Sequence, residues 1–204
     1  MTTSIFSSRF VEDTQAVLAL INQNDIELVV STLANTREKG GRLFLAGSGG
    51  GAGHASHAAC DFRKLCQLES YCVTDNVSEL TARTNDEGWD TAYSNWLRAS
   101  RINSQDCLFV FSVGGGSIEP PVSVNLVNAV KLAKEVGASI VGIVGRDGGA
   151  LRQLATASIL IPTVESQFVT PQAEGLQALM WHLIVSHPSL AASEAKWEGL
   201  DKKG

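Results

Sequence analysis

The sequence lacks several features that would have directed its interpretation elsewhere. It contains no secretory signal and no apolar run long enough to span a membrane, so we expect neither export nor membrane insertion. It has no excess of basic residues: 16 Lys and Arg stand against 21 Asp and Glu, for a formal net charge of −5. That balance argues against a nucleic-acid partner. It also shows no internal repeat, low-complexity stretch or linker, so residues 1–204 are expected to form one domain.

Paired cysteines are absent as well. The four cysteines, Cys60, Cys66, Cys72 and Cys107, form no Cys-x-x-Cys motif, and their spacing does not match a zinc finger. We interpret them as reduced and mostly buried thiols of a cytoplasmic protein.

Two glycine-serine loops are the most informative features that the sequence does contain. Residues 47–51 follow the apolar run 42–46, and residues 112–117 follow the run 106–111; each loop precedes a helix-like segment. A strand–loop–helix turn of this kind offers backbone N–H groups and a positive helix end to an anion. Two such loops in one small domain predict a phosphorylated ligand, which backbone donors can bind even in an acidic protein.

The apolar pattern predicts alternating strands and helices. Strands are expected at 42–46, 70–74, 106–112, 139–145 and 157–162, and helices at 52–66, 89–101, 122–136, shortly after 148–149, and at 171–186. This order predicts a three-layer α/β/α sandwich around a five-stranded parallel sheet, of the flavodoxin-like type, with its core in residues 41–190. Both glycine loops and residues 75–76 and 145–149 would then meet at the carboxyl edge of the sheet.

Residues 1–40 show helical spacing with a break near 22–25, which predicts an N-terminal helical hairpin. Its helices carry more apolar positions than one small sheet can cover. We therefore expect them to contact copies of the same chain in an oligomer.

Four side chains on two predicted helices are candidates for chemistry. His57 and Asp61 are four residues apart on one helix face, and Glu174 and His182 are eight apart on the last helix. Two imidazoles and two carboxylates suit a divalent ion such as Zn²⁺, and they equally suit acid–base proton transfer. Eight helical residues rise about 12 Å, so Glu174 and His182 can share an ion only if the helix begins after Glu174 or a neighbouring subunit supplies one of them. The His57–Asp61 pair is also typical of a surface hydrogen bond, and His182, beside Trp181, is also typical of a helix residue that packs at an interface.

The order of these motifs resembles the sugar isomerase (SIS) domain family, in particular the phosphoheptose isomerases. The resemblance covers nearly the whole chain and consists of Gly47–Gly50, His57-x-x-x-Asp61, Asp75–Ser78, Thr84–Gly88, Ser112–Ser117, Gly145–Gly149 and Glu174-x-x-Gln177-x-x-x-x-His182. It implies a cytoplasmic, homotetrameric isomerase (an intramolecular oxidoreductase) of heptose biosynthesis, a branch of carbohydrate metabolism. Such an enzyme converts sedoheptulose 7-phosphate to D-glycero-D-manno-heptose 7-phosphate through an enediol.

The resemblance also implies roles for individual residues. Asp61 and His182 would be catalytic, and zinc would be held by His57, Asp61, Glu174 and His182. The phosphosugar would be bound by Ser48, Gly49, Gly50, Asn85, Asp86, Ser112, Gly114, Gly115, Gly116 and Ser117.

The chain departs from the family pattern at three places. Asp61 is one methylene shorter than the family's glutamate, Glu174 replaces a glutamine, and Val113 and Gly114 replace hydroxyl residues of the phosphate loop. These changes keep open a non-catalytic reading, as a phosphosugar-binding regulator or a SIS protein that associates with a replication initiator.

A nucleotide-dependent enzyme is a further alternative, because Gly47-x-Gly49-x-x-Ala52 fits the dinucleotide fingerprint. It leaves the second loop unexplained. We therefore expect no nucleotide cofactor; the expected partners are a phosphorylated sugar and copies of the chain itself.

Overall fold

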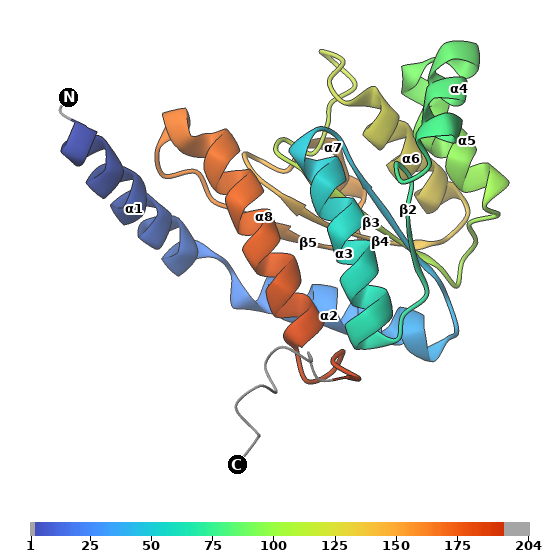
Figure 1. The fold of residues 1–204 in the computed structure, drawn as a ribbon, viewed down its shortest axis with the longest axis horizontal. Coiled ribbons are helices and arrows are strands. Elements are labelled where there is room, and N and C mark those ends of the chain that lie inside the picture. Colours follow the sequence, from blue (N-terminus) through green and yellow to red (C-terminus); the bar gives the residue numbers. More distant parts are fainter. Residues whose placement is uncertain (1–2, 194–204) are drawn as a thin grey trace.

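The computed structural model describes residues 3–193 and has an α/β architecture (Figure 1). Its five strands form one parallel sheet in the order β2-β1-β3-β4-β5. The strands are β1 (Leu43–Gly47), β2 (Ser70–Cys72), β3 (Cys107–Ser112), β4 (Ser139–Val144) and β5 (Ala157–Leu160). The predicted five-stranded parallel sheet is confirmed. Residues 1–2 and 194–204 of the predicted domain lie outside the described residues.

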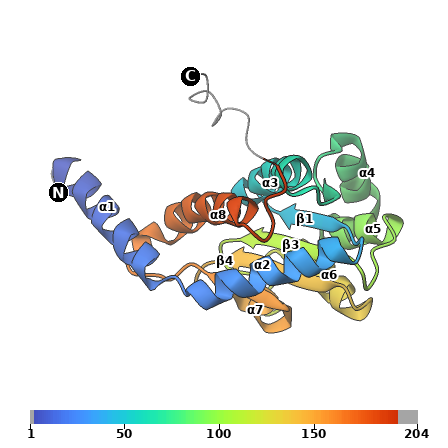
Figure 2. The same ribbon diagram turned by 90° about the horizontal axis from the view of Figure 1, so that it is seen from below.

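Helices cover both faces of the sheet. They are α1 (Thr3–Leu20), α2 (Gln23–Glu38), α3 (Gly50–Cys66), α4 (Val77–Glu87), α5 (Trp89–Ala99), α6 (Val124–Glu135), α7 (Gly149–Leu154) and α8 (Val169–Ser186), with a short 3-10 turn η1 (Ser166–Phe168) before α8. One core lies between the sheet and α2, α3 and α8, and the other between the sheet and α5, α6 and α7 (Figure 2). This is the predicted three-layer sandwich.

Strand β1 shows why the sheet is buried on both sides. Leu43 and Leu45 point into the first core, and Phe44 and Ala46 into the second, since successive side chains of a strand alternate between faces. All five residues of the strand are buried. Removing a side chain such as Leu or Phe from water contributes about 1.5–3 kcal/mol, so continuous apolar runs are stable only in a sheet covered on both faces.

The N-terminal segment forms the two predicted helices but not the predicted hairpin. Helix α2 lies across one face of the sheet, whereas α1 extends away from the body of the molecule (Figures 1 and 2). The rings of Phe6 and Phe10 pack edge-to-face on Phe168 of η1, at centroid distances of 5.6 and 5.1 Å. These contacts direct α1 toward the start of α8 rather than back along α2.

Helix α4 was not predicted from the apolar pattern. It has no fully buried residue, and Leu80 packs against the second core while staying partly exposed, so its apolar face is too small to detect from the sequence. Its local signal is a cap: the side-chain oxygen of Asn76 accepts hydrogen bonds from the backbone N–H groups of Ser78 and Glu79. Within residues 3–193, none of the helices has the length and apolarity that crossing a membrane requires.

Candidate functional site

A pocket of about 670 Å³ lies at the carboxyl edge of the sheet. Its walls come from the loop after β3, the turn after β4, Ser48 after β1 and Thr170 at the start of α8. The predicted phosphate-binding residues that line it are Ser48, Ser112, Gly114, Gly116 and Ser117. The structure therefore brings parts of both glycine loops to one cavity.

Backbone hydrogen bonds hold the second glycine loop in place. Gly115 has a φ of +72°, and its N–H donates to the Ser112 hydroxyl oxygen at 3.0 Å, while its carbonyl accepts from Leu151 N–H at 3.0 Å. A Cβ on Gly115 would lie 1.8 Å from the carbonyl oxygen of Gly148. Only glycine fits both the left-handed backbone and this close approach.

Ser117 lies in a small hairpin and not at the start of the next helix. Its backbone N–H donates to the Val122 carbonyl at 2.9 Å, and α6 begins only at Val124. The residue before the helix, Ser123, has a φ of +50°, makes no side-chain cap hydrogen bond and also lines the pocket. Sequence reasoning overlooked this second hydroxyl. Pro120 and Pro121 could have indicated it, because a helix cannot run through them and a serine is a frequent N-cap.

A buried polar network fixes the first glycine loop. The Tyr93 hydroxyl donates to the Gly47 carbonyl at 2.8 Å, and the Asn125 amide donates to the Ser48 hydroxyl oxygen at 3.3 Å. Burial raises the pKa of Tyr93, so this hydroxyl stays protonated and remains a donor. Asn125 is fully buried, and its side-chain oxygen has no partner among the described residues. Neither residue was singled out from the sequence, because tertiary packing alone brings α5 and α6 to β1.

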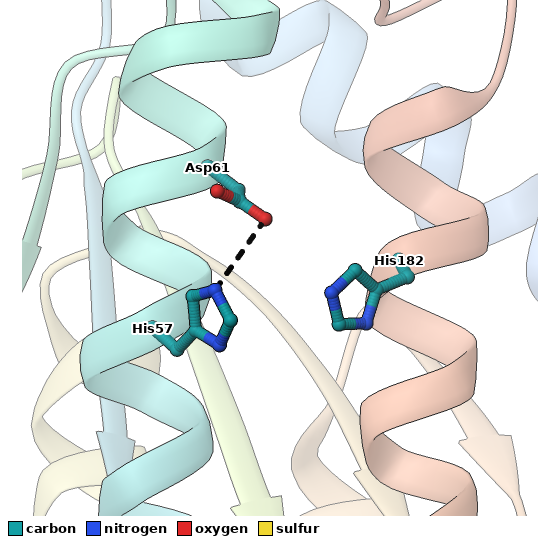
Figure 3. A group of neighbouring side chains, drawn as sticks. All are labelled: His57, Asp61 and His182. Carbon is teal, nitrogen blue, oxygen red and sulfur yellow. Dashed lines mark ion pairs between the residues drawn. The ribbon is translucent and has the colours of Figure 1, made fainter. Parts of the chain in front are cut away.

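A second group of polar side chains lies between α3 and α8. His57 and Asp61 project from α3 and His182 from α8, and one ligand atom of each lies within 4.8 Å of the others (Figure 3). The distance from His57 Nε2 to Asp61 Oδ2 is 3.9 Å. The His57 side chain is 61% exposed and that of Asp61 17%, so the group faces solvent.

Contacts on α8 set the orientation of the two imidazoles. His182 Nδ1 lies 2.7 Å from the carbonyl oxygen of Ala178. A carbonyl can only accept, so Nδ1 carries the proton and Nε2 of the neutral ring keeps a free lone pair. The buried ring of Trp181 stacks on His182 at 3.5 Å between centroids and meets His57 edge-on at 4.8 Å.

Glu174 does not join this group within one chain. Helix α8 runs unbroken from Val169 to Ser186, so the expectation that the helix might begin after Glu174 is wrong. The Glu174 carboxylate instead lies at the start of α3, where a Cβ on Gly50 would be 2.7 Å from its Oε2. The described chain thus assembles three of the four predicted metal ligands, and a contribution of Glu174 from a neighbouring subunit stays a prediction.

Four other predicted substrate-binding residues lie away from the pocket walls. Asn85 and Asp86 are exposed in the last turn of α4, where the Asn85 amide donates to Asp86 Oδ1 at 2.7 Å. Gly49 and Gly50 form the start of α3. The structure does not bring these four residues to the pocket within one chain.

The three-residue group fits a divalent ion by its donor set. Two imidazole nitrogens and one carboxylate oxygen match the protein ligands of many catalytic zinc sites, which leave one position open. The same three groups can also exchange protons with a bound ligand.

A parallel α/β sandwich with two glycine loops at the carboxyl edge is a domain of the doubly wound class, in which ligands bind at that edge of the sheet. The model of the SIS domain family matches residues 9–145, and the chain belongs to this family.

Individual relatives agree with this assignment. The lincomycin biosynthesis protein LmbN of Streptomyces lincolnensis is 40% identical over 166 residues, which are 76% of this chain and 58% of LmbN. The phosphoheptose isomerase of Aliarcobacter butzleri is 28% identical over 178 residues, covering 85% of this chain and 88% of that enzyme. The structure of phosphoheptose isomerase GmhA from Neisseria gonorrhoeae superposes with a TM-score of 0.77 at 23% identity, over 91% of this chain and 97% of GmhA, and confirms the fold. The predicted enzyme class, an isomerase, is confirmed by these relatives.

Proposed function

We propose that this isomerase interconverts sedoheptulose 7-phosphate and D-glycero-D-manno-heptose 7-phosphate, in the cytoplasm and as a homotetramer. The observation that carries the proposal is the meeting of His57, Asp61 and His182 between α3 and α8, in a fold with a pocket of about 670 Å³ at its sheet edge. Relatives named phosphoheptose isomerase that align with most of both chains support the heptose substrate.

The phosphate binds at the loop after β3. Backbone N–H groups around Gly114 and Gly116 and the hydroxyls of Ser112 and Ser117 face the pocket and donate to its oxygens. The loop is already tied to α7 by backbone hydrogen bonds, so little order has to be gained on binding.

The reaction is a proton transfer between neighbouring carbons. Asp61 removes the proton from the carbon beside the carbonyl, which gives an enediol, and returns it to the adjacent carbon. His182, with its Nε2 lone pair free, moves the proton between the two oxygens. Asp61 lies eleven residues after Gly50, which puts it about 16 Å along α3 from the first glycine loop. The carbonyl end of the sugar must therefore extend away from the phosphate or toward a second subunit.

His57, Asp61 and His182 would hold a divalent ion such as Zn²⁺, which supplies Lewis-acid polarisation of the carbonyl and enediolate oxygens when bound. An ion bound to Asp61 and to Nε2 of His182 would compete with the proton-transfer roles of these two residues. A neighbouring subunit's Glu174 would complete the set. Protein purified without chelator should then contain near-stoichiometric metal, measured by plasma mass spectrometry. Metal-free protein with full activity would remove the ion from the proposal.

Exposed apolar side chains support the oligomer. On α1 they are Ile5, Phe6, Val11, Leu18 and Leu20, and on α8 they are Leu179 and Leu183. Exposed apolar side chains that gather on neighbouring helices are typical of a protein–protein interface. Light scattering should give the mass of a tetramer, and a stable monomer would contradict this part of the proposal.

A second candidate is the isomerisation of a different phosphosugar. It is favoured by the higher identity to the lincomycin biosynthesis protein LmbN, 40% against 28% for the phosphoheptose isomerases. Incubation with sedoheptulose 7-phosphate and NMR of the product separates the candidates. Turnover of other ketose phosphates alone would favour the second, and binding without any turnover would favour a regulator.

A further inference from the structure

We propose that Arg146 is a phosphate-binding residue of this chain and that Gly114 gives its guanidinium access to the loop. The inference deepens the proposed function, on which the identity of the phosphorylated ligand rests. Arg146 lies in the turn Gly145–Gly149 between β4 and α7.

The backbone of Arg146 is held in an unfavourable conformation. Its φ is +53°, in the left-handed region that side chains other than glycine, asparagine and aspartate rarely adopt. Gly145 before it donates its N–H to the Val113 carbonyl of the glycine loop, and Gly148 donates back to the Gly145 carbonyl, both at 3.0 Å. The turn is hydrogen-bonded to the glycine loop and keeps Arg146 in a strained backbone conformation. Strain of this kind often marks a functional residue.

The side chain of Arg146 lies over Gly114. A Cβ on Gly114 would be 3.6 Å from Arg146 Cδ and 3.9 Å from Nη1, which is ordinary contact distance. The guanidinium stem thus lies beside the space where a longer side chain at position 114 would extend. Val113 and Gly114 carry no hydroxyl donor, and the guanidinium of Arg146 lies beside this part of the loop.

The charge of Arg146 is available to a ligand. Several arginines are paired, for example Arg42 with Asp106 and Arg83 with Glu79, whereas in residues 3–193 no ion pair or side-chain hydrogen bond engages Arg146. The neighbouring Asp147 accepts a hydrogen bond from Gly149 N–H at 3.1 Å. Arg146 and Asp147 are the charged side chains among the described residues that line the pocket.

This arrangement suits a phosphate dianion. A guanidinium offers a planar fork of donors that binds two phosphate oxygens at once, and such charge-assisted contacts are stronger than those of a hydroxyl. In a protein of net charge −5 a local cation adds to the attraction that the backbone N–H groups of the loop exert on an anion, and Arg146 supplies that cation beside Gly114.

The test measures binding of inorganic phosphate by calorimetry to the full chain and to two variants. Arg146→Gln keeps most of the side-chain length without the charge. Arg146→Gly removes the guanidinium and relieves the backbone strain, so it should unfold at the same or a higher temperature than the original protein. We expect both to bind phosphate about tenfold or more weakly, and with less dependence on salt between about 0.05 and 0.2 M.

Arg101→Gln is the matched control. Arg101 is an exposed arginine with a φ of +54° that does not line the pocket, and its variant should bind phosphate like the original protein. Unchanged phosphate affinity in either Arg146 variant, or an equal loss in Arg101→Gln, would overturn the proposal. Phosphate binding through Arg146 without isomerisation of any phosphosugar would instead refute the proposed function and leave this inference standing.

Discussion

The pocket after β3 and the histidine-aspartate group on α3 and α8 are built in different ways. The pocket is framed by backbone: the loop carbonyls of Gly115 and Gly116 accept from Leu151 and Ala150 at 3.0 and 2.9 Å. The group of His57, Asp61 and His182 consists of side chains that project from two helices toward solvent. The first region is held by backbone hydrogen bonds within one chain, and the second is open to solvent on one side.

This difference separates binding from chemistry. A loop closed by backbone hydrogen bonds is preorganised and tolerates few substitutions, since its shape depends on positions where only glycine fits. Side chains on a helix surface can be exchanged without harm to the fold, but each exchange changes the chemistry directly. Substitutions in the first region should therefore affect stability and binding, and substitutions in the second should affect turnover alone.

The largest effect is expected for Asp61→Asn. The amide cannot accept the proton that isomerisation moves, so kcat should fall by about 10²–10⁴-fold, while phosphate affinity measured by calorimetry stays the same. Glu135→Gln, the same acid-to-amide change on the exposed end of α6, should leave both unchanged. Full turnover by Asp61→Asn would mean that another residue is the base, and that the histidine-aspartate group is not the region that carries the chemistry.

Gly115→Ala tests the other region. With a φ of +72° and the Gly148 carbonyl 1.8 Å from the new Cβ, the loop has to move, and we expect a loss of about 3 kcal/mol or more in the free energy of unfolding. Chemical denaturation followed by circular dichroism measures the loss, and calorimetry should show no phosphate binding. A variant of normal stability would mean that the loop rearranges easily and is not preorganised.

Ser117→Ala is expected to have a smaller effect, confined to binding. The hydroxyl lines the pocket, and loss of a hydrogen bond to a charged phosphate costs about 1–3 kcal/mol of binding free energy. The hairpin should persist, because Ser117 joins it through backbone atoms at 2.9 and 3.0 Å. Ser123→Ala removes the other pocket hydroxyl, at the residue before α6, and its phosphosugar affinity is measured for comparison. Equal phosphosugar affinity of Ser117→Ala and the original protein in calorimetry would remove Ser117 from the binding set.

The sequence predicted the parts of the fold that depend on local patterns. Continuous apolar runs located all five strands, and glycine clusters located the loops that frame the pocket. Helix α4 was not predicted because it has no fully buried residue and only a small apolar face. The predicted hairpin was wrong because contacts with Phe168 direct α1 elsewhere.

The candidate site was predictable only where spacing along one helix determines proximity. His57 and Asp61 are neighbours by the helical repeat, whereas Arg146 reaches Gly114 and Tyr93 reaches Gly47 through tertiary packing that no local pattern encodes. The family resemblance predicted that His182 lies near His57, as the structure has it. It also predicted that Glu174 joins them, which the unbroken helix α8 does not allow within one chain.

The smallest expected effect comes from Gly53→Ala, which repeats the glycine-to-alanine change on the helix that carries His57 and Asp61. Gly53 lies in α3, has no positive φ, and a Cβ there would meet nothing within 4 Å. Alanine favours a helix interior over glycine, so the free energy of unfolding should rise by up to about 1 kcal/mol with kcat unchanged. The same glycine-to-alanine change should therefore raise the free energy of unfolding at position 53 and lower it at position 115. Chemical denaturation of both variants, with turnover measured alongside, checks this difference. A loss of stability in Gly53→Ala would mean that the added methyl group does not find open space on α3, and would contradict the expected difference in sign from Gly115→Ala.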